Sequence, residues 1–259
     1  MTDPILVERR GSALWITINR PDRRNAINNS VITGIQAGLE RARSEKGVRV
    51  VVLTGAGEKA FCAGGDLQQG TSVFDDDPVE PTTDFGRLAR FAREMQIPMV
   101  GRINGACVAG GTGLMALCDI VVAADHAKFG LPEARVGVFP FQVHVYFRKL
   151  ILPRHVAELA LLGEYVDAQR AREMGLINYV VPAAELDAQV AWVCEKLALA
   201  SPAAIRRGKY AMTAMQDMAF HEALSFAEGQ IMLTAAGEDA AEGLAAFNEK
   251  RRPRWQEES

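Results

Sequence analysis

Two turns made almost entirely of small residues are the first candidates for chemistry. Ala63–Asp66 (AGGD) closes the stretch that follows the apolar run VRVVVLTG, and Val108–Gly113 (VAGGTG) directly precedes the apolar segment LMALC. A glycine-rich turn at a helix start leaves N–H groups unpaired, in the positive potential of the helix dipole. The N–H groups of Ala63 and Gly110 could therefore form an oxyanion hole, in which each donor contributes roughly 3 kcal/mol of transition-state stabilisation. Either turn alone could simply permit tight packing, but two of them, each after a strand, favour the oxyanion hole.

A single carboxylate, Glu133, is the candidate for moving protons. It follows Pro132 in the segment KFGLPEARVGVFP, and no Asp or Glu occurs between Gly105 and Cys118, around the second small-residue turn. A positioned carboxylate can take a proton from a reacting group and return it. A glutamate after a proline can equally be an acid favoured by the dipole at the first turn of a helix. The residues alone leave both interpretations of Glu133 open.

Two further patterns only imitate functional sites. Gly55-x-Gly57-x-x-Ala60 after an apolar run looks like a dinucleotide fingerprint, but that fingerprint needs a helix to begin at its third small residue, and another turn follows instead. The acids at Asp75–Asp77 are expected in a solvated loop over Gln68–Asp84, because three consecutive side chains cannot converge on one ion. The sequence therefore predicts neither a nicotinamide enzyme nor a metal site.

The composition is that of an ordinary globular chain. The 259 residues are 49% hydrophobic and 24% charged, and a formal net charge of −3 gives no electrostatic footprint for nucleic acid. No apolar run approaches the roughly 20 residues that cross a bilayer, and MTDPILVERR lacks the apolar core of a secretion signal. We therefore expect a cytoplasmic protein with neither a nucleic-acid nor a membrane partner. The four cysteines show no C-x-x-C spacing, so neither a zinc site nor a disulfide framework is expected.

The elements that must position these residues alternate between strand and helix up to Pro153, and helical patterns dominate thereafter. Alternating apolar residues and short buried runs predict strands, and apolar residues three and four apart predict helices. The predicted strands are Ile5–Arg10, Ala13–Asn19, Val48–Leu53, Pro98–Ile103, Ile120–Ala123 and Asn178–Val181, and the first helices are Asn29–Arg43, Phe85–Met95 and one ending near Cys118. Repeated strand–helix units of this kind predict a mixed α/β body.

With these motifs in view, the chain resembles the crotonase, or enoyl-CoA hydratase/isomerase, superfamily. The segments INRPDRRNAI, VVVLTGAGEKAFCAGGDL, INGACVAGGTGLMALCDIVVAAD, KFGLPEARVGVFP and GLAAFNEKRRP occur in the family's order over nearly the whole chain. The resemblance implies an α/β fold, a crotonase-like spiral of ββα units, over residues 1–195. It also implies a C-terminal helical region over residues 196–259 that mediates trimers, which often pair into hexamers.

The resemblance further implies a substrate and the residues that bind it. An acyl-CoA thioester would place its carbonyl oxygen between the N–H groups of Ala63 and Gly110, with Glu133 as the catalytic carboxylate. Coenzyme A would then be part of the substrate, with no separate cofactor. The residues expected near the nucleotide are Arg24, Ala26, Ala63, Gly64, Gly65, Asp66 and Leu67, together with Phe247 and Lys250 from a neighbouring subunit.

The chain departs from the hydratase pattern at Gly113, where typical hydratases carry a second glutamate that faces the bound water together with the first. Hydration must deprotonate water and deliver a proton to the α carbon, and two carboxylates divide that work. Moving a double bond from the β,γ to the α,β position needs only one base. Isomerases of the family resemble this chain in keeping only the acid at Glu133, so hydration and isomerisation both stay open.

An aromatic segment, VFPFQVHVYFRKL, stands where typical hydratases have a glycine-rich stretch. Phe139, Phe141 and Val143 are expected to form an apolar acyl pocket, and either phenylalanine could occupy the space that the family's glycines leave free for water. Gln142 or His144 could position a water, although a histidine on an apolar stretch is more often an ordinary helix residue. Asp119, at the end of the predicted helix, is expected to be structural.

Three functions follow from these observations. The favoured one is a crotonase-type enzyme that performs enolate chemistry on an enoyl-CoA. The alternative is a catalytically silent acyl-CoA-binding protein that lost the acidic counterpart of Gly113. The nicotinamide enzyme is the least favoured, because its only support is a glycine motif without its helix.

Overall fold

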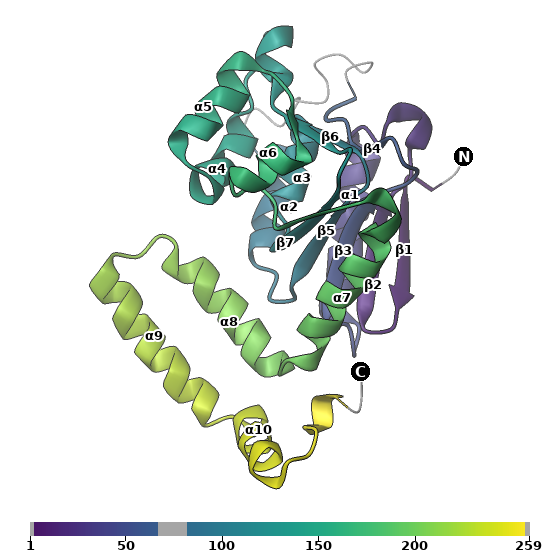
Figure 1. The fold of residues 1–259 in the computed structure, drawn as a ribbon. Helices are drawn as coiled ribbons and strands as arrows, with labels where there is room; N and C mark the ends of the chain where they lie inside the picture. The colour runs from purple at the N-terminus through teal and green to yellow at the C-terminus, as the bar shows by residue number, and fades with distance from the viewer. Residues whose placement is uncertain (1–2, 67–81, 257–259) are drawn as a thin grey trace.

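The computed structural model describes residues 3–66 and 82–256 and contains two β-sheets (Figure 1). In the described residues the larger sheet has six strands in the order β1-β2-β3-β5-β7-β10. Their bounds are β1 (Ile5–Arg10), β2 (Ala13–Ile18), β3 (Val50–Gly55), β5 (Met99–Ile103), β7 (Ile120–Ala124) and β10 (Tyr179–Val181). The β1–β2 pair is antiparallel, whereas every other neighbouring pair in this sheet is parallel. The predicted hairpin and the predicted strands are thus confirmed.

A second sheet of four short strands has the order β4-β6-β8-β9. Its strands are β4 (Ala60–Cys62), β6 (Ala106–Val108), β8 (Lys128–Gly130) and β9 (Val166–Asp167). The first three run parallel, and β9 pairs antiparallel with β8. β3, β5 and β7 of the larger sheet are each followed by one of these strands and then by a helix, which gives three successive ββα units. This second sheet was not predicted from the sequence. Because β4 begins at Ala60, no helix starts there, which agrees with the rejection of the dinucleotide fingerprint.

Ten α-helices lie within the described residues. They are α1 (Asn29–Ser44), α2 (Asp84–Arg93), α3 (Gly110–Met115), α4 (Phe141–Leu150), α5 (Pro153–Leu162), α6 (Ala168–Glu173), α7 (Leu186–Leu199), α8 (Pro202–Met215), α9 (Phe220–Ala235) and α10 (Glu238–Glu249). Short 3-10 helices occupy Pro21–Arg23, Pro132–Val136, Ala183–Glu185 and Arg254–Gln256. α1 and α2 match their predictions closely, whereas α3 ends at Met115, before Cys118. The predicted loop Gln68–Asp84 lies outside the described residues up to residue 81, as do Asp75–Asp77.

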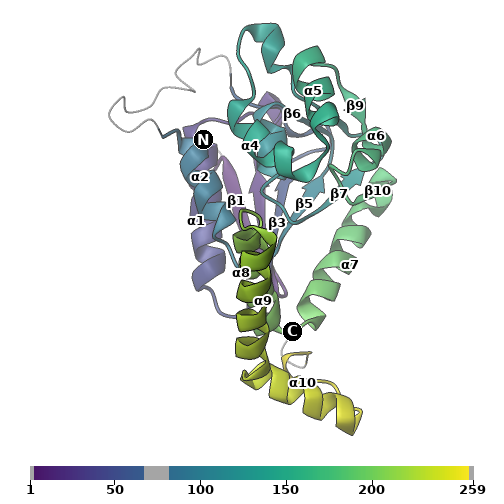
Figure 2. The same cartoon turned by 90° about the vertical axis from the view of Figure 1, so that its left-hand side faces the viewer.

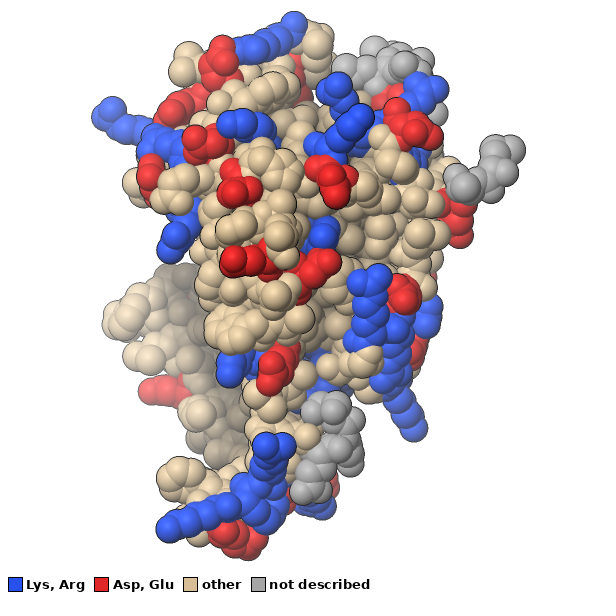
Figure 3. Space-filling model, turned by 45° about the vertical axis from the view of Figure 1, so that its right-hand side comes forward, with Lys and Arg blue, Asp and Glu red and all other residues tan. Residues whose placement is uncertain are grey.

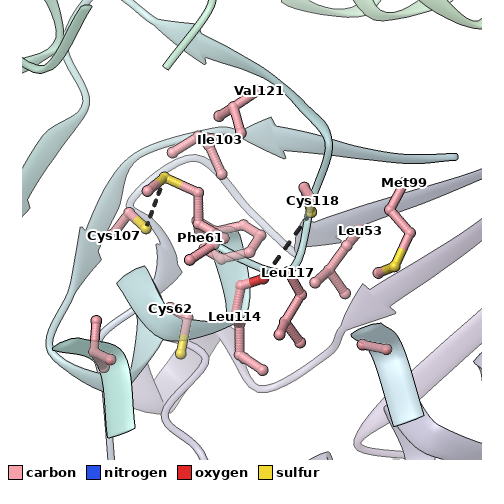
Figure 4. Packing of buried hydrophobic residues seen from close by; sticks show 14 of the residues in the cluster. Leu53, Phe61, Cys62, Met99, Ile103, Cys107, Leu114, Leu117, Cys118 and Val121 are labelled. Carbon is pink, nitrogen blue, oxygen red and sulfur yellow. Dashed lines mark hydrogen bonds between the residues drawn. The ribbon is translucent and has the colours of Figure 1, made fainter. Parts of the chain in front are cut away.

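The central strands of the larger sheet are buried on both faces, and alternate residues of each strand point to opposite sides. In β3, Val51 and Leu53 join the main hydrophobic cluster, while Val50 and Val52 pack in a second cluster with Val190 of α7. The main cluster also takes in the second sheet and α1 to α6. Figure 4 shows part of it, including Phe61, Cys107 and Leu114. Burial raises the pKa of the Cys62 thiol in this cluster to about 12.

The C-terminal helices α8 to α10 extend away from the sheets (Figures 1 and 2). An ion pair anchors α8: Lys209 Nζ lies 2.6 Å from Asp119 Oδ2, and the same oxygen accepts from the Met99 N–H at 2.7 Å. Asp119 is therefore structural, as predicted. The predicted boundary at residue 195 falls inside α7, and the division into two domains stays a prediction.

The surface carries both kinds of charge. On the face seen in Figure 3, Lys and Arg side chains are interspersed with Asp and Glu side chains. Large apolar side chains are also exposed on α8 to α10, among them Met212, Phe220, Ile231, Met232 and Phe247. In the described part of the chain, no helix has the length and apolar character that spanning a bilayer requires.

Candidate active site

Three segments that carry candidate functional residues follow neighbouring strands of the second sheet. β4, β6 and β8 are parallel neighbours. The segment Ala63–Asp66 follows β4, Ala109–Gly113 follows β6, and Glu133 comes shortly after β8. Ligands of parallel α/β sheets bind beyond the carboxyl ends of the strands. The small second sheet thus brings together both small-residue turns and the candidate carboxylate.

The two small-residue turns are in contact. Gly64 has φ +88°, and a Cβ built on it would lie 2.7 Å from the Ala109 Cβ and 3.4 Å from the Gly110 nitrogen. Ala109 is itself unusual, because a non-glycine residue at φ 52° and ψ −132° occupies a sparsely populated region of backbone space. Such strain persists only where the surrounding structure imposes it, and it is concentrated at functional sites.

The first of the two proposed N–H donors needs a correction. The Ala63 N–H already donates to the Arg24 carbonyl oxygen at 3.1 Å. The Arg24 carbonyl reaches it through a turn in which Arg24 and Asn25 have φ 50° and 57°. The Gly65 N–H has no acceptor in the described part of the chain, and its nitrogen would lie 3.9 Å from a Cβ built on Gly110. Gly65 therefore replaces Ala63 as the available donor.

Gly110 lies where an unpaired N–H was predicted. It is the first residue of α3, where an N–H has no intrahelical partner, and none of the described residues accepts from it. The N–H groups of Gly65 and Gly110 are thus two unpaired donors on adjoining turns. Such a pair can stabilise a developing oxyanion.

The Asp66 carboxylate is occupied by an ion pair. Asp66 is 7% exposed, and its Oδ2 lies 2.8 Å from Arg20 Nη2. Arg20 also donates to the carbonyl oxygen of Ala26, which is buried. The Asp66 N–H in turn donates to the Ile27 carbonyl at 2.8 Å. Asp66 therefore joins the AGGD turn to the segment around Ala26.

Glu133 lies in the short 3-10 helix Pro132–Val136 and is partly buried. Its Oε2 atom is buried and has no hydrogen-bond partner among the described residues. Burial raises the pKa of the carboxyl group, while a backbone hydrogen bond opposes that shift. A carboxyl group with a buried oxygen that lacks a partner, and with a raised pKa, is suited to proton transfer.

The space next to Gly113 is filled by side chains of two other helices. A Cβ built on Gly113 would lie 2.7 Å from Cζ of Phe85 and 3.1 Å from Cγ2 of Val143. Phe85 of α2 and Val143 of α4 supply the three atoms nearest to that point. Phe85 could not be selected from the sequence, because nothing in the local pattern connects α2 with α3.

The other predicted residues are spread over several elements. Phe139 is partly buried, and its ring centroid is 5.0 Å from that of Phe141, which is 74% exposed. Their part in an acyl pocket stays a prediction. His144 is an exposed residue of α4, and Gln142 Nε2 donates to Thr83 Oγ1.

Not all of the residues expected near the nucleotide lie together in the structure. The Arg24 side chain is exposed, and Leu67 lies outside the described residues. Phe247 is 82% exposed on α10, and Lys250 follows the last turn of that helix. α10 lies at the end of the molecule away from β4 and β6 (Figure 1). Within one chain, Phe247 and Lys250 are therefore remote from the candidate site.

Comparison with known proteins identifies close relatives over the full length. The family model described as enoyl-CoA hydratase/isomerase matches residues 8–258. A 2,3-dehydroadipyl-CoA hydratase of Escherichia coli (strain K12) is 32% identical over 255 residues, which cover 96% of this chain and 97% of that protein. The solved enoyl-CoA hydratase of Bacillus anthracis has a TM-score of 0.90 at 31% identity and covers 98% of this chain and 99% of its own. An enoyl-CoA hydratase/isomerase of Marinobacter aquaeolei has a TM-score of 0.90 at 29% identity, over 98% of this chain and 100% of its own. The predicted spiral of ββα units is confirmed.

Proposed function

The chain belongs to the enoyl-CoA hydratase/isomerase family, and we propose that it stabilises the enolate of an acyl-CoA thioester at the carboxyl ends of β4, β6 and β8. The thioester carbonyl oxygen accepts from the N–H groups of Gly65 and Gly110. Donors that are fixed before the reaction stabilise the negative charge as it develops on that oxygen. The support is that both N–H groups lack acceptors among the described residues and belong to turns in contact.

Glu133 is the only carboxylate assigned to the reaction, and its buried, unpartnered Oε2 is the observation that carries the proposal. The reaction that suits one base is isomerisation of a β,γ-enoyl-CoA. Glu133 removes a proton from the α carbon, so that the C–H electron pair forms a dienolate whose charge rests on the thioester oxygen. The same carboxyl group returns the proton to the γ carbon, and the double bond is left between the α and β carbons.

Hydration is the second candidate function, because the E. coli relative is named as a hydratase of 2,3-dehydroadipyl-CoA. In that reaction the water oxygen bonds to the β carbon, and a proton reaches the α carbon. With Gly113 in place of a second acid, Glu133 would have to take the proton from water and also supply one to carbon.

The coenzyme A moiety extends from the AGGD turn towards Arg24 and Ala26, and the acyl chain lies along Phe139, Phe141 and Val143. Phe247 and Lys250 act on the nucleotide of a neighbouring subunit in a homotrimer or hexamer. The support for this assembly is the distance of α10 from its own chain's site and the exposed apolar side chains of α8 to α10. The protein acts in the cytoplasm, without a separate cofactor.

The test is a comparison of two substrates. The purified protein is incubated with a β,γ-enoyl-CoA and, separately, with crotonyl-CoA, while the absorbance of the conjugated thioester is followed. A rising absorbance with the first substrate indicates isomerisation, and a falling absorbance with the second indicates hydration. Binding of both esters in calorimetry without turnover of either would refute the proposed enzyme and favour the silent acyl-CoA binder.

A further inference from the structure

The Phe85 ring fills the space next to Gly113 in the candidate site. Phe85 lies in the first turn of α2, and its ring reaches across to Gly113 of α3. A Cβ at Gly113 would be 2.7 Å from Phe85 Cζ and 3.3 Å from Cε2, which is closer than carbon atoms pack. Val143 Cγ2, 3.1 Å from the same point, closes the space from α4. The space next to Gly113 is therefore occupied by side-chain carbons of Phe85 and Val143.

Hydrogen bonds from two other helices hold the first turn of α2 in place. Thr83 caps α2 by accepting from the Gly86 N–H at 2.9 Å, and its hydroxyl also accepts from Gln142 of α4. Asn29, at the start of α1, donates to Asp84. One turn further along, the Tyr146 hydroxyl of α4 donates to the Ala89 carbonyl at 2.8 Å. These hydrogen bonds fix the backbone turn that carries Phe85, and so they keep its ring next to Gly113.

We propose that Phe85 is a specificity-determining residue that excludes water from the space next to Gly113 and so limits the site to proton transfer between the α and γ carbons of the substrate. This inference rests on the proposed function. A water that attacks the β carbon needs polar partners to hold it, and the side-chain carbons of Phe85 and Val143 offer none. Glu133, the carboxylate assigned to the reaction, then exchanges its proton only with the substrate.

The inference is tested with four proteins: the wild type, Phe85→Ala, Gly113→Glu and the double variant. The ratio of crotonyl-CoA hydration to β,γ-enoyl-CoA isomerisation is measured for each. Gly113→Glu alone is expected to hydrate no faster than the wild type, because the ring blocks the new side chain. In the double variant hydration should rise at least about tenfold, since a second carboxylate can contribute roughly 10²–10⁴-fold by general acid–base catalysis.

Phe85→Ala by itself adds no charge and tests the exclusion of water directly. Its hydration-to-isomerisation ratio is expected to rise at least about threefold, a small part of the general acid–base range. Phe85→Leu, which keeps the space apolar and largely filled, should stay near the wild-type ratio. Phe91→Ala is the matched control, because Phe91 is on the same helix and its ring faces Arg43. These variants change no residue of the proposed proton-transfer machinery.

Three outcomes would overturn the inference. They are an unchanged ratio in Phe85→Ala, hydration by Gly113→Glu as fast as by the double variant, and a folded, isomerising double variant that hydrates no faster than the wild type. Failure of the proposed function would look different, because the wild type would then isomerise nothing or Glu133→Gln would keep its activity.

Discussion

Ala63 and Arg24 are joined by a backbone hydrogen bond of 3.1 Å from the Ala63 N–H to the Arg24 carbonyl. Because the Ala63 N–H already has this acceptor, the donor of the AGGD turn that remains available is the Gly65 N–H. Because Gly65 and Gly110 lie on turns that touch, the two free N–H groups can serve one oxygen atom. The position of the proposed oxyanion hole therefore depends on the turn around Arg24 as much as on the glycines.

The amide resonances of these residues provide the first prediction. Binding of a β-ketoacyl-CoA, which presents an enolate oxygen without reacting further, should move the amide proton resonances of Gly65 and Gly110 downfield. The Ala63 amide should move little, because its acceptor within the protein is unchanged. Proton–nitrogen correlation spectra of the labelled protein measure all three. A large shift at Ala63 with none at Gly65 would restore the donor pair first expected from the sequence.

The pKa of Glu133 predicts how stability depends on pH. Burial raises the pKa of this carboxyl above its usual value of 4.5, so the folded protein binds the proton more tightly than the unfolded chain does. The resulting stabilisation is fully present below the unfolded pKa and is lost as pH rises through the folded pKa. Glu133→Gln removes this loss, so its melting temperature should exceed that of the wild type by more at pH 7 than at pH 4. A difference of the same size at both pH values would mean that Glu133 is not desolvated.

Asp66 gives a prediction about stability and binding together. Its ion pair with Arg20 is largely buried, and removal of one partner of a buried pair costs about 3–5 kcal/mol. Asp66→Ala should therefore lower the free energy of unfolding in urea by about that amount. Asp84→Ala is a comparison at a more exposed ion pair and should cost less than about 1 kcal/mol. If Asp66→Ala unfolds like the wild type and only loses affinity for the CoA ester, Asp66 is a ligand-binding residue after all.

The sequence predicted the larger sheet well but not the smaller one, and the reason is physical. Val50–Gly55 is a run of six residues whose composition alone favours a strand. β4, β6 and β8 have three residues each, too few for a period to be visible. They become strands only because the chain pairs them with one another. The residues of the candidate site follow the carboxyl ends of these strands. A pattern in the local sequence therefore could not predict that those residues come together.

The same limit applies to the details of the site. Gly110 could be selected from residue type and spacing, and Glu133 from the resemblance to the family; the structure places both after strands of the small sheet, beyond the carboxyl ends of β6 and β8. The choice of Ala63 over Gly65 failed because it depended on two residues with positive φ, Arg24 and Asn25. Phe85 was missed because its contact with Gly113 joins two helices that are distant in the sequence.

The apolar side chains on α8 to α10 predict assembly. Met212, Ile231, Met232 and Phe247 are all more than half exposed in the single chain, and apolar surface of this kind marks a contact between subunits. Light scattering at micromolar concentration should give the mass of a trimer or a multiple of it. Ile231→Asp should shift the distribution towards smaller species, while Glu195→Gln on α7 should leave it unchanged. A monomeric wild type would contradict this prediction.

The central claim is that Glu133 moves protons while backbone N–H groups hold the carbonyl. The most direct measurement is the turnover of a β,γ-enoyl-CoA by Glu133→Gln, with the affinity for the CoA ester determined by calorimetry on the same preparation. Glu195→Gln, an exposed glutamate of α7, is the matched control. We predict that Glu133→Gln loses turnover by at least about 10²-fold while its affinity stays within about tenfold of the wild type, and that the control keeps both. Turnover by Glu133→Gln at the wild-type rate would contradict the account.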